Sequence, residues 1–140
     1  MNPVVKLGLA MLFVAVAGGS SSSAQTPRLN QLMRTKLDHS KNVLEAVVTS
    51  NWQQLERESR ALAQVTRDPA WSALRMPEYV RQSEAFLRAT DDLIGASRLR
   101  DLEAASLGFI SLSTSCVSCH RYMARSRVAS ERPREDPLFR

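Results

Sequence analysis

Apolar residues recur along this chain at intervals of three and four, and this spacing predicts amphipathic helices throughout. The first helix is expected over residues 29–48, where one face collects Leu29, Leu32, Met33, Val43, Leu44, Val47 and Val48. Ser50 followed by Gln53 is typical of a capping box, in which a serine hydroxyl and a returning side chain bond the first free N–H groups. A second helix should therefore begin there, with a stripe of Trp52, Leu55, Ser59, Leu62 and either Val65 or Thr66.

Two prolines bracket the next connection, which carries Trp71, Leu74 and Met76. Pro77 is predicted to be the first residue of a third helix, because a missing N–H costs nothing at that position. The buried seam of this helix is expected to contain Tyr79, Ser83, Phe86, Thr90 and Leu93. Residues 95–100 are read as a turn, after which Asp101 can cap a fourth helix.

The fourth helix carries both cysteines of the chain on its apolar seam. Its seam residues follow one another at spacings of three and four: Leu102, Ala105, Phe109, Leu112, Cys116 and Cys119. Four amphipathic helices with short connections predict an all-α fold, specifically an antiparallel four-helix bundle.

The two ends of the chain do not read as parts of that fold. Residues 1–24 combine a positively charged start, a short apolar run and small residues before position 25, which predicts a cleaved signal peptide and a soluble periplasmic protein. The alternative is an uncleaved anchor, although the apolar run is shorter than the ~20 residues of a membrane span. Residues 25–127 should form one domain, and residues 128–140 a flexible polar tail. No later segment reads as apolar enough to cross a membrane, so we expect no insertion after cleavage.

The net charge of +5 comes from lysines and arginines scattered among 14 acidic residues, without a basic block. This distribution argues against nucleic-acid binding. Several arginines flank the last helix and follow the cysteines: Arg98, Arg100, Arg121, Arg125 and Arg127. They are expected either to form a positive rim that steers an acidic redox partner or to be ordinary solvated side chains.

Cys116, Cys119 and His120 form a Cys-x-x-Cys-His sequence, the attachment signature of a c-type haem. Two thiols on one helical turn can each add to a haem vinyl group, and the adjacent imidazole can be the proximal iron ligand. The motif predicts one covalent haem c per chain. Three alternatives are a thioredoxin-like redox pair, half of a zinc site and a structural disulfide. A thioredoxin-like pair is disfavoured because the cysteines lie late in a helix. A zinc site is disfavoured because His39 is the only other histidine, and a disulfide because the loop that it would close is very short.

Taken together, the signal peptide, the four helices and "CVSCH" on the last helix resemble the class II cytochromes c, the cytochrome c prime family. The resemblance covers approximately residues 29–127. Low-spin members take a methionine of the first helix as second axial ligand, and "QLMRTKL" at residues 31–37 resembles that segment, which maps the ligand onto Met33. The family often has an aromatic residue and an arginine three and four positions after the haem histidine, where this chain has Met123 and Ala124. Relatives often pair as dimers, so a homodimer is a candidate assembly.

The distal side of the iron decides the function. Met33, His39 and Met76 are the candidate ligands, and a site without a protein ligand is the fourth alternative. Met123 stands three residues after His120 on the same helix, so it should pack rather than bind iron.

A six-coordinate iron suits one-electron transfer to a redox partner protein. An open site walled by apolar side chains would bind small gases such as nitric oxide or carbon monoxide; the candidate wall residues are Leu32, Leu37 and Phe109. A third reading treats haem as a structural staple in an interaction module. The sequence offers no catalytic dyad, so we do not expect an enzyme.

Overall fold

The computed structural model describes residues 22–131, and the side chains of residues 27–127. The elements in this range are all helices, in the order α1 (Ser22–Val48), α2 (Trp52–Val65), α3 (Pro69–Ser72), α4 (Pro77–Leu99) and α5 (Leu102–Glu131). No strand occurs within these residues. The predicted all-helical fold class is therefore confirmed.

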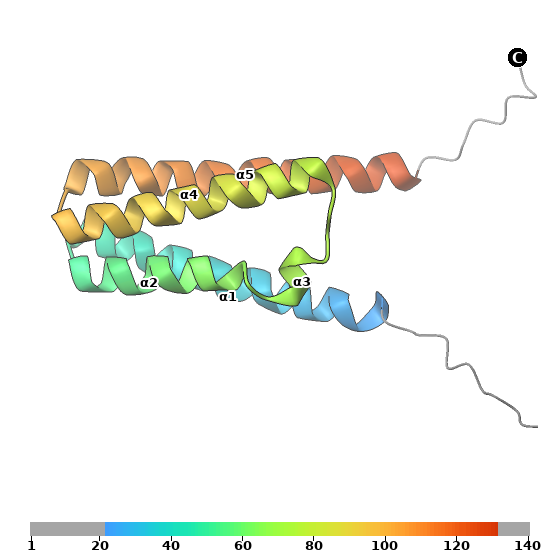
Figure 1. Cartoon of the computed structure of the whole chain (residues 1–140), viewed down its shortest axis with the longest axis horizontal. Helices are drawn as coiled ribbons and strands as arrows, with labels where there is room; N and C mark the ends of the chain where they lie inside the picture. Colours follow the sequence, from blue (N-terminus) through green and yellow to red (C-terminus); the bar gives the residue numbers. More distant parts are fainter. Residues whose placement is uncertain (1–21, 132–140) are drawn as a thin grey trace, which may run out of the picture.

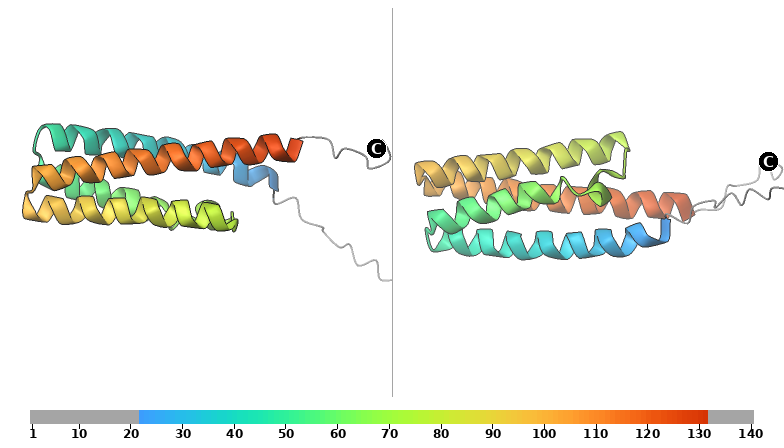
Figure 2. Two further views of the ribbon diagram at one scale, coloured as in Figure 1. Left: turned by 90° about the horizontal axis from the view of Figure 1, so that it is seen from above. Right: turned by 60° about the horizontal axis from the view of Figure 1, so that its bottom comes forward.

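Four long helices lie side by side, and α3 is a single turn within the connection between α2 and α4 (Figure 1). The α1–α2 and α4–α5 turns are at the same end of the molecule, so each helix of these pairs runs opposite to its partner (Figure 1). The main packing interfaces join α1 to α2, α2 to α4, and α4 to α5. Helices α1 and α5 also lie next to each other, as both views in Figure 2 show, but they meet over a smaller interface.

The core is drawn from all five helices, with Trp71 as the contribution of α3, and it matches most of the predicted seams. Its largest fully buried apolar side chains are Phe86, Leu55, Leu62, Leu93, Leu112 and Val43. The seam of α2 is confirmed and also includes Glu58. On α1 the predicted stripe is partly wrong, because Leu44 and Val48 are exposed, and a buried Lys36 lies on the inward face instead. Leu102 is also exposed and does not join the seam of α5.

Two predicted helix ends differ from the structure. Asn51, not Ser50, caps α2: its side-chain oxygen accepts a hydrogen bond from the N–H of Gln54 at 3.1 Å. Ser50 instead takes the left-handed conformation, with φ of 52°, that ends α1. Residues 95–100 are not a turn, because α4 continues through Gly95 to Leu99.

Three other local predictions are confirmed. Pro77 opens α4, and the seam residues Tyr79, Phe86, Thr90 and Leu93 are buried. Asp101 caps α5 by accepting a hydrogen bond from the N–H of Ala104 at 3.0 Å.

The ends of the helical region extend beyond the predicted domain limits. Helix α1 begins at Ser22, and α5 continues to Glu131. Most of the expected signal peptide and of the expected flexible tail, residues 1–21 and 132–140, lies outside the described residues.

Helix α5 is more apolar than the sequence reading allowed. Between Leu102 and Arg127 it is long and apolar enough, by length and composition, to span a membrane. The expectation that no later segment reaches this level is therefore wrong. The reason is that α5 carries apolar residues on its outer side as well as on its seam: Leu102, Leu107, Ile110 and Val117 are exposed. Since a core helix of a water-soluble protein passes the same criterion, the finding assigns no membrane location.

Candidate functional site

The motif cysteines lie on α5 and face the helical core. Cys116 and Cys119 are each partly buried and pack against the core, and neither is joined in a disulfide. Since residues three apart share a helix face, the two sulfur atoms belong to one side of α5. His120 is exposed and lines a groove together with Cys116. The three motif residues thus stand on neighbouring positions of one helical turn.

A groove of about 840 Å³ runs between α1 and α5, beside the motif. Its apolar lining comes from both helices and consists of Met33, Leu37, Leu44, Phe109, Cys116 and Val117. Three of these side chains, Leu37, Leu44 and Val117, are about half exposed. The volume lies within the range of ~300–1,000 Å³ that is usual for small-molecule and cofactor pockets. We refer to this feature as the α1–α5 groove.

Lys36 lines the same groove and is buried, with only 6% of its surface exposed. Its Nζ lies 3.9 Å from the centroid of the Phe86 ring and 4.9 Å from that of Trp71, and Cys116 lines the same groove. Burial lowers the pKa of Lys36 below its usual value, while the nearby Cys116 and Cys119 oppose that shift. Among the described side chains, no carboxylate forms an ion pair with Lys36.

The electrostatics around Cys119 keep its thiol protonated. Burial raises the pKa of Cys119, the positive charge of Lys36 opposes the shift, and Cys116 and Glu78 add to it. A thioredoxin-like pair needs a thiol whose pKa is depressed, usually at a helix start. The environment of Cys119 has the opposite effect, and the cysteine lies deep within α5.

The aromatic side chains below the groove are fixed by hydrogen bonds. The hydroxyl group of Tyr79 donates to the carbonyl oxygen of Trp71 at 2.8 Å, and the indole N–H of Trp71 donates to Ser83 Oγ at 3.1 Å. Burial raises the pKa of Tyr79 to about 12. The rings of Trp71 and Phe86 are 5.6 Å apart. They form a rigid apolar floor behind Lys36.

The three candidate distal ligands differ in whether they line the α1–α5 groove. Met33 is partly buried and lines the α1–α5 groove together with His120. His39 is not among the groove residues; its Nδ1 atom lies 2.8 Å from Glu58 Oε2, in a contact between α1 and α2. Met76 lies in the connection before α4, where its sulfur accepts a hydrogen bond from Tyr122 at 3.7 Å. Of the three, only Met33 shares the groove with His120.

The residues expected to wall the site or to pack in the core also differ in whether they line the groove. Leu37 and Phe109 line the groove, whereas Leu32 packs against the core and is not part of the lining. Met123 packs against the same core, which agrees with its predicted packing role.

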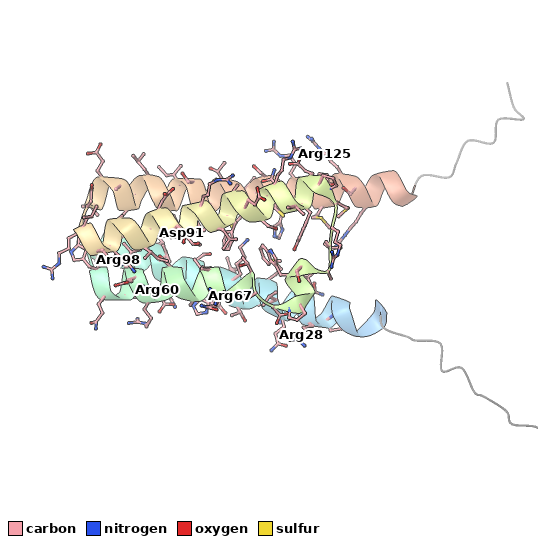
Figure 3. All side chains as sticks on the ribbon, in the orientation of Figure 1. Arg28, Arg60, Arg67, Asp91, Arg98 and Arg125 are labelled. Carbon is pink, nitrogen blue, oxygen red and sulfur yellow. The ribbon has the colours of Figure 1, made fainter. Side chains whose placement is uncertain are left out.

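The predicted arginine rim is only partly present near the motif. Arg121 lines the groove, and Arg34 and Lys41 of α1 lie on its opposite side. Arg98 lies at the far end of the molecule from Arg125, as their labels in Figure 3 show, and it bonds Glu56 at 3.2 Å. Arg100 adjoins that far end too. The part of the prediction that concerns Arg98 and Arg100 is wrong, because the motif lies about 21–27 Å along α5 from its first residue, at 1.5 Å per residue.

The donor set at this site suits a covalently held porphyrin better than a bare metal ion. Within the described residues, no three His, Cys, Asp or Glu side chains come together as ligands for a metal. The site instead offers two thiols and one imidazole on a single turn, beside an apolar groove whose half-exposed residues a flat apolar group would cover. These residues fit the group that the motif predicts.

Lys36 is the residue at this site that the sequence reading missed. The signal was present, since Lys36 stands seven residues before Val43 and three after Met33, within the inward spacing of α1. A lysine at such a position is ordinarily read as solvated, because lysines are rarely fully buried.

Comparison of the chain with protein-family models, with curated proteins and with solved structures found no match. The argument for function therefore rests on the motif and on the groove.

Proposed function

We propose that this protein is an exported c-type cytochrome that transfers single electrons. In this proposal the four long helices form an antiparallel four-helix bundle, residues 1–24 direct the chain to the periplasm, and one haem c lies in the α1–α5 groove. The supporting observation is that Cys116 and His120 line a large apolar groove, and that Cys119, which packs against the core and is not part of the lining, shares their turn of α5.

The residues of the motif have distinct roles in the proposal. The thiols of Cys116 and Cys119 hold the group through two thioether bonds, and the imidazole of His120 donates a nitrogen to the iron. When bound, the haem supplies a centre that accepts and releases one electron. Attachment to one rigid helix keeps the imidazole in place during both redox states, which favours rapid electron exchange.

The groove residues of α1 complete the proposed site. Met33 is the proposed sixth ligand, because it lines the groove with His120 and its thioether is free of other partners among the described contacts. Leu37 and Phe109 cover the group and keep water from it. Arg34, Lys41 and Arg121 place positive charge at the rim, which suits an acidic redox partner protein.

A five-coordinate, gas-binding haem protein is the second candidate function. The observation that favours it is the apolar lining of the groove beside His120, where Leu37 and Phe109 would admit a small uncharged gas such as nitric oxide or carbon monoxide. The two functions differ in whether Met33 occupies the sixth position.

Optical spectra of the purified protein test the proposal. The electron carrier should be low-spin when oxidised, should reduce reversibly, and should bind carbon monoxide slowly, because a ligand must first leave the iron. A high-spin spectrum with immediate carbon monoxide binding would favour the gas-binding function. A protein that carries no haem after expression with the c-type maturation apparatus would contradict both.

A further inference from the structure

The buried amine of Lys36 is the feature of the molecule that packing does not explain. A charged ammonium group inside a protein is costly unless hydrogen bonds or opposite charges compensate for it. Here the amine lies against two aromatic rings, and no described carboxylate pairs with it. A methionine or leucine would fill this position on the inward face of α1 without that cost.

Lys36 is also placed close to every part of the proposed site. It lines the groove together with Cys116, Met33 and His120, and its Nζ is held over the rings of Phe86 and Trp71. The faces of aromatic rings attract cations, so these rings hold a positive charge in place with little reorganisation. The amine is therefore held at a defined position in an apolar setting.

We propose that Lys36 raises the reduction potential of the haem through its buried positive charge. This inference rests on the proposed function. The physical reason is that ferric haem carries one more positive charge than ferrous haem, so a nearby cation destabilises the ferric form more. Because the surroundings are apolar, this repulsion is screened far less than it would be at the surface.

The charge and the shape of Lys36 can be separated by two substitutions. Lys36→Met removes the charge and keeps an unbranched side chain of similar length. Lys36→Arg keeps a cation that does not deprotonate in proteins and that also stacks on aromatic rings. An arginine is not expected to replace an amine ligand on iron, so this variant also tests whether Lys36 binds the iron directly.

Lys41 provides the matched control on the same helix. It lines the same groove but is well exposed, with 65% of its side chain accessible, and it pairs with Asp38 at 3.2 Å. Lys41→Met changes the net charge of the protein by the same amount as Lys36→Met. Any effect of overall charge alone should appear equally in both variants.

The experiment is a redox titration of the holoprotein and its three variants at neutral pH and moderate ionic strength, after covalent haem has been verified on a denaturing gel and helix content by circular dichroism. We expect Lys36→Met to lower the equilibrium constant for reduction at least tenfold, about 59 mV for one electron. Lys36→Arg should stay near the wild type, and Lys41→Met should change little.

Three results would overturn the inference. The potential of Lys36→Met could equal that of the wild type, Lys41→Met could lower the potential as much as Lys36→Met, or Lys36→Arg could become high-spin, which would make the amine a ligand. Each leaves the proposed function intact, because the haem is covalently attached and redox-active in all of them. Absence of covalent haem from the wild type would instead contradict the proposed function itself.

Discussion

At the scale of single residues, Met33 is where the two candidate functions separate. It lines the α1–α5 groove with His120, whereas His39 is held by Glu58 and Met76 by Tyr122. We expect Met33→Leu to abolish the weak near-infrared band of a sulfur–iron bond, to move the ferric iron toward high spin and to speed carbon monoxide binding. Leucine keeps most of the volume, so the loss of stability should stay below ~1.5 kcal/mol.

Met33→Ala serves as the companion variant. It removes the same ligand but also leaves a cavity, so it should cost about 2–4 kcal/mol of stability in addition. An unchanged spectrum in Met33→Leu would make Met33 a packing residue, and the choice would pass to His39 or an open site.

Glu58 is the other residue whose environment has a measurable consequence. Burial tends to raise the pKa of Glu58, but hydrogen bonds from His39, Asn42 and Arg57 outweigh it and hold the pKa below the usual value. A depressed pKa in the folded state means that the ionised form stabilises the fold. This contribution is complete above the pKa of the unfolded chain, about 4.3, and is lost as pH falls through the folded value.

Chemical unfolding between about pH 5 and pH 3 tests this expectation. The wild type should lose stability across that interval more steeply than Glu58→Gln, which has no carboxyl group to protonate there. Glu84→Gln, an exposed substitution on α4, should follow the wild type. Parallel curves for the wild type and Glu58→Gln would show that the contacts of Glu58 do not stabilise the fold.

At the scale of helices, alanine substitution of Gly95 in α4 and of Gly108 in α5 is expected to change the stability of the fold in opposite directions. Gly95 has no atom within 4 Å of the position that a Cβ would take, whereas a Cβ at Gly108 would lie 3.1 Å from the side chain of Leu93. Leu93 is fully buried and has little room to move. Gly95→Ala should therefore stabilise the fold by about 0.5–1 kcal/mol, and Gly108→Ala should destabilise it.

Thermal melts of the two alanine variants check this contrast directly. Both substitutions improve helix propensity equally, so the difference between them measures the close approach of α5 to α4. If Gly108→Ala were as stabilising as Gly95→Ala, the α4–α5 interface would have to be looser than the structure indicates.

Helices were predictable from the sequence where a spacing of three and four coincided with a strong start signal. Pro77 and Asp101 begin α4 and α5 as expected, since their roles depend only on local backbone chemistry. The end of α4 was not predictable in this way. Gly95 suggests the end of a helix, yet α4 continues because the turns around it are packed in the core through buried Leu93 and Ala96.

At the scale of the whole molecule, the sequence located the motif but not the surroundings of the groove. Cys116, Cys119 and His120 were found by their spacing alone. The rotation of α1 about its own axis decides that His39 faces α2 and that Lys36 faces inward. The spacing of apolar residues in the sequence determines this rotation only to within about one residue. The partners of both side chains therefore came only from the packed structure.

The groove also links the fold to the proposed cofactor. Leu37, Leu44 and Val117 are exposed along it, and a covalently held porphyrin would remove such surface from water. The variant Cys116→Ala with Cys119→Ala, which cannot attach haem, should therefore melt earlier and less cooperatively than the wild type by circular dichroism. Ser118→Ala, between the two cysteines, is the control. A melt of the double variant as sharp and as high as that of the wild type would contradict this coupling.

The proposed function depends first on the covalent attachment of haem to Cys116 and Cys119. Acid–acetone extraction tests it most directly, applied to protein produced with the c-type maturation apparatus. We predict that the colour of the wild type stays with the precipitated protein, and that Cys116→Ala with Cys119→Ala yields protein without bound colour. Haem that extracts freely from the wild type into the acetone would contradict the claim.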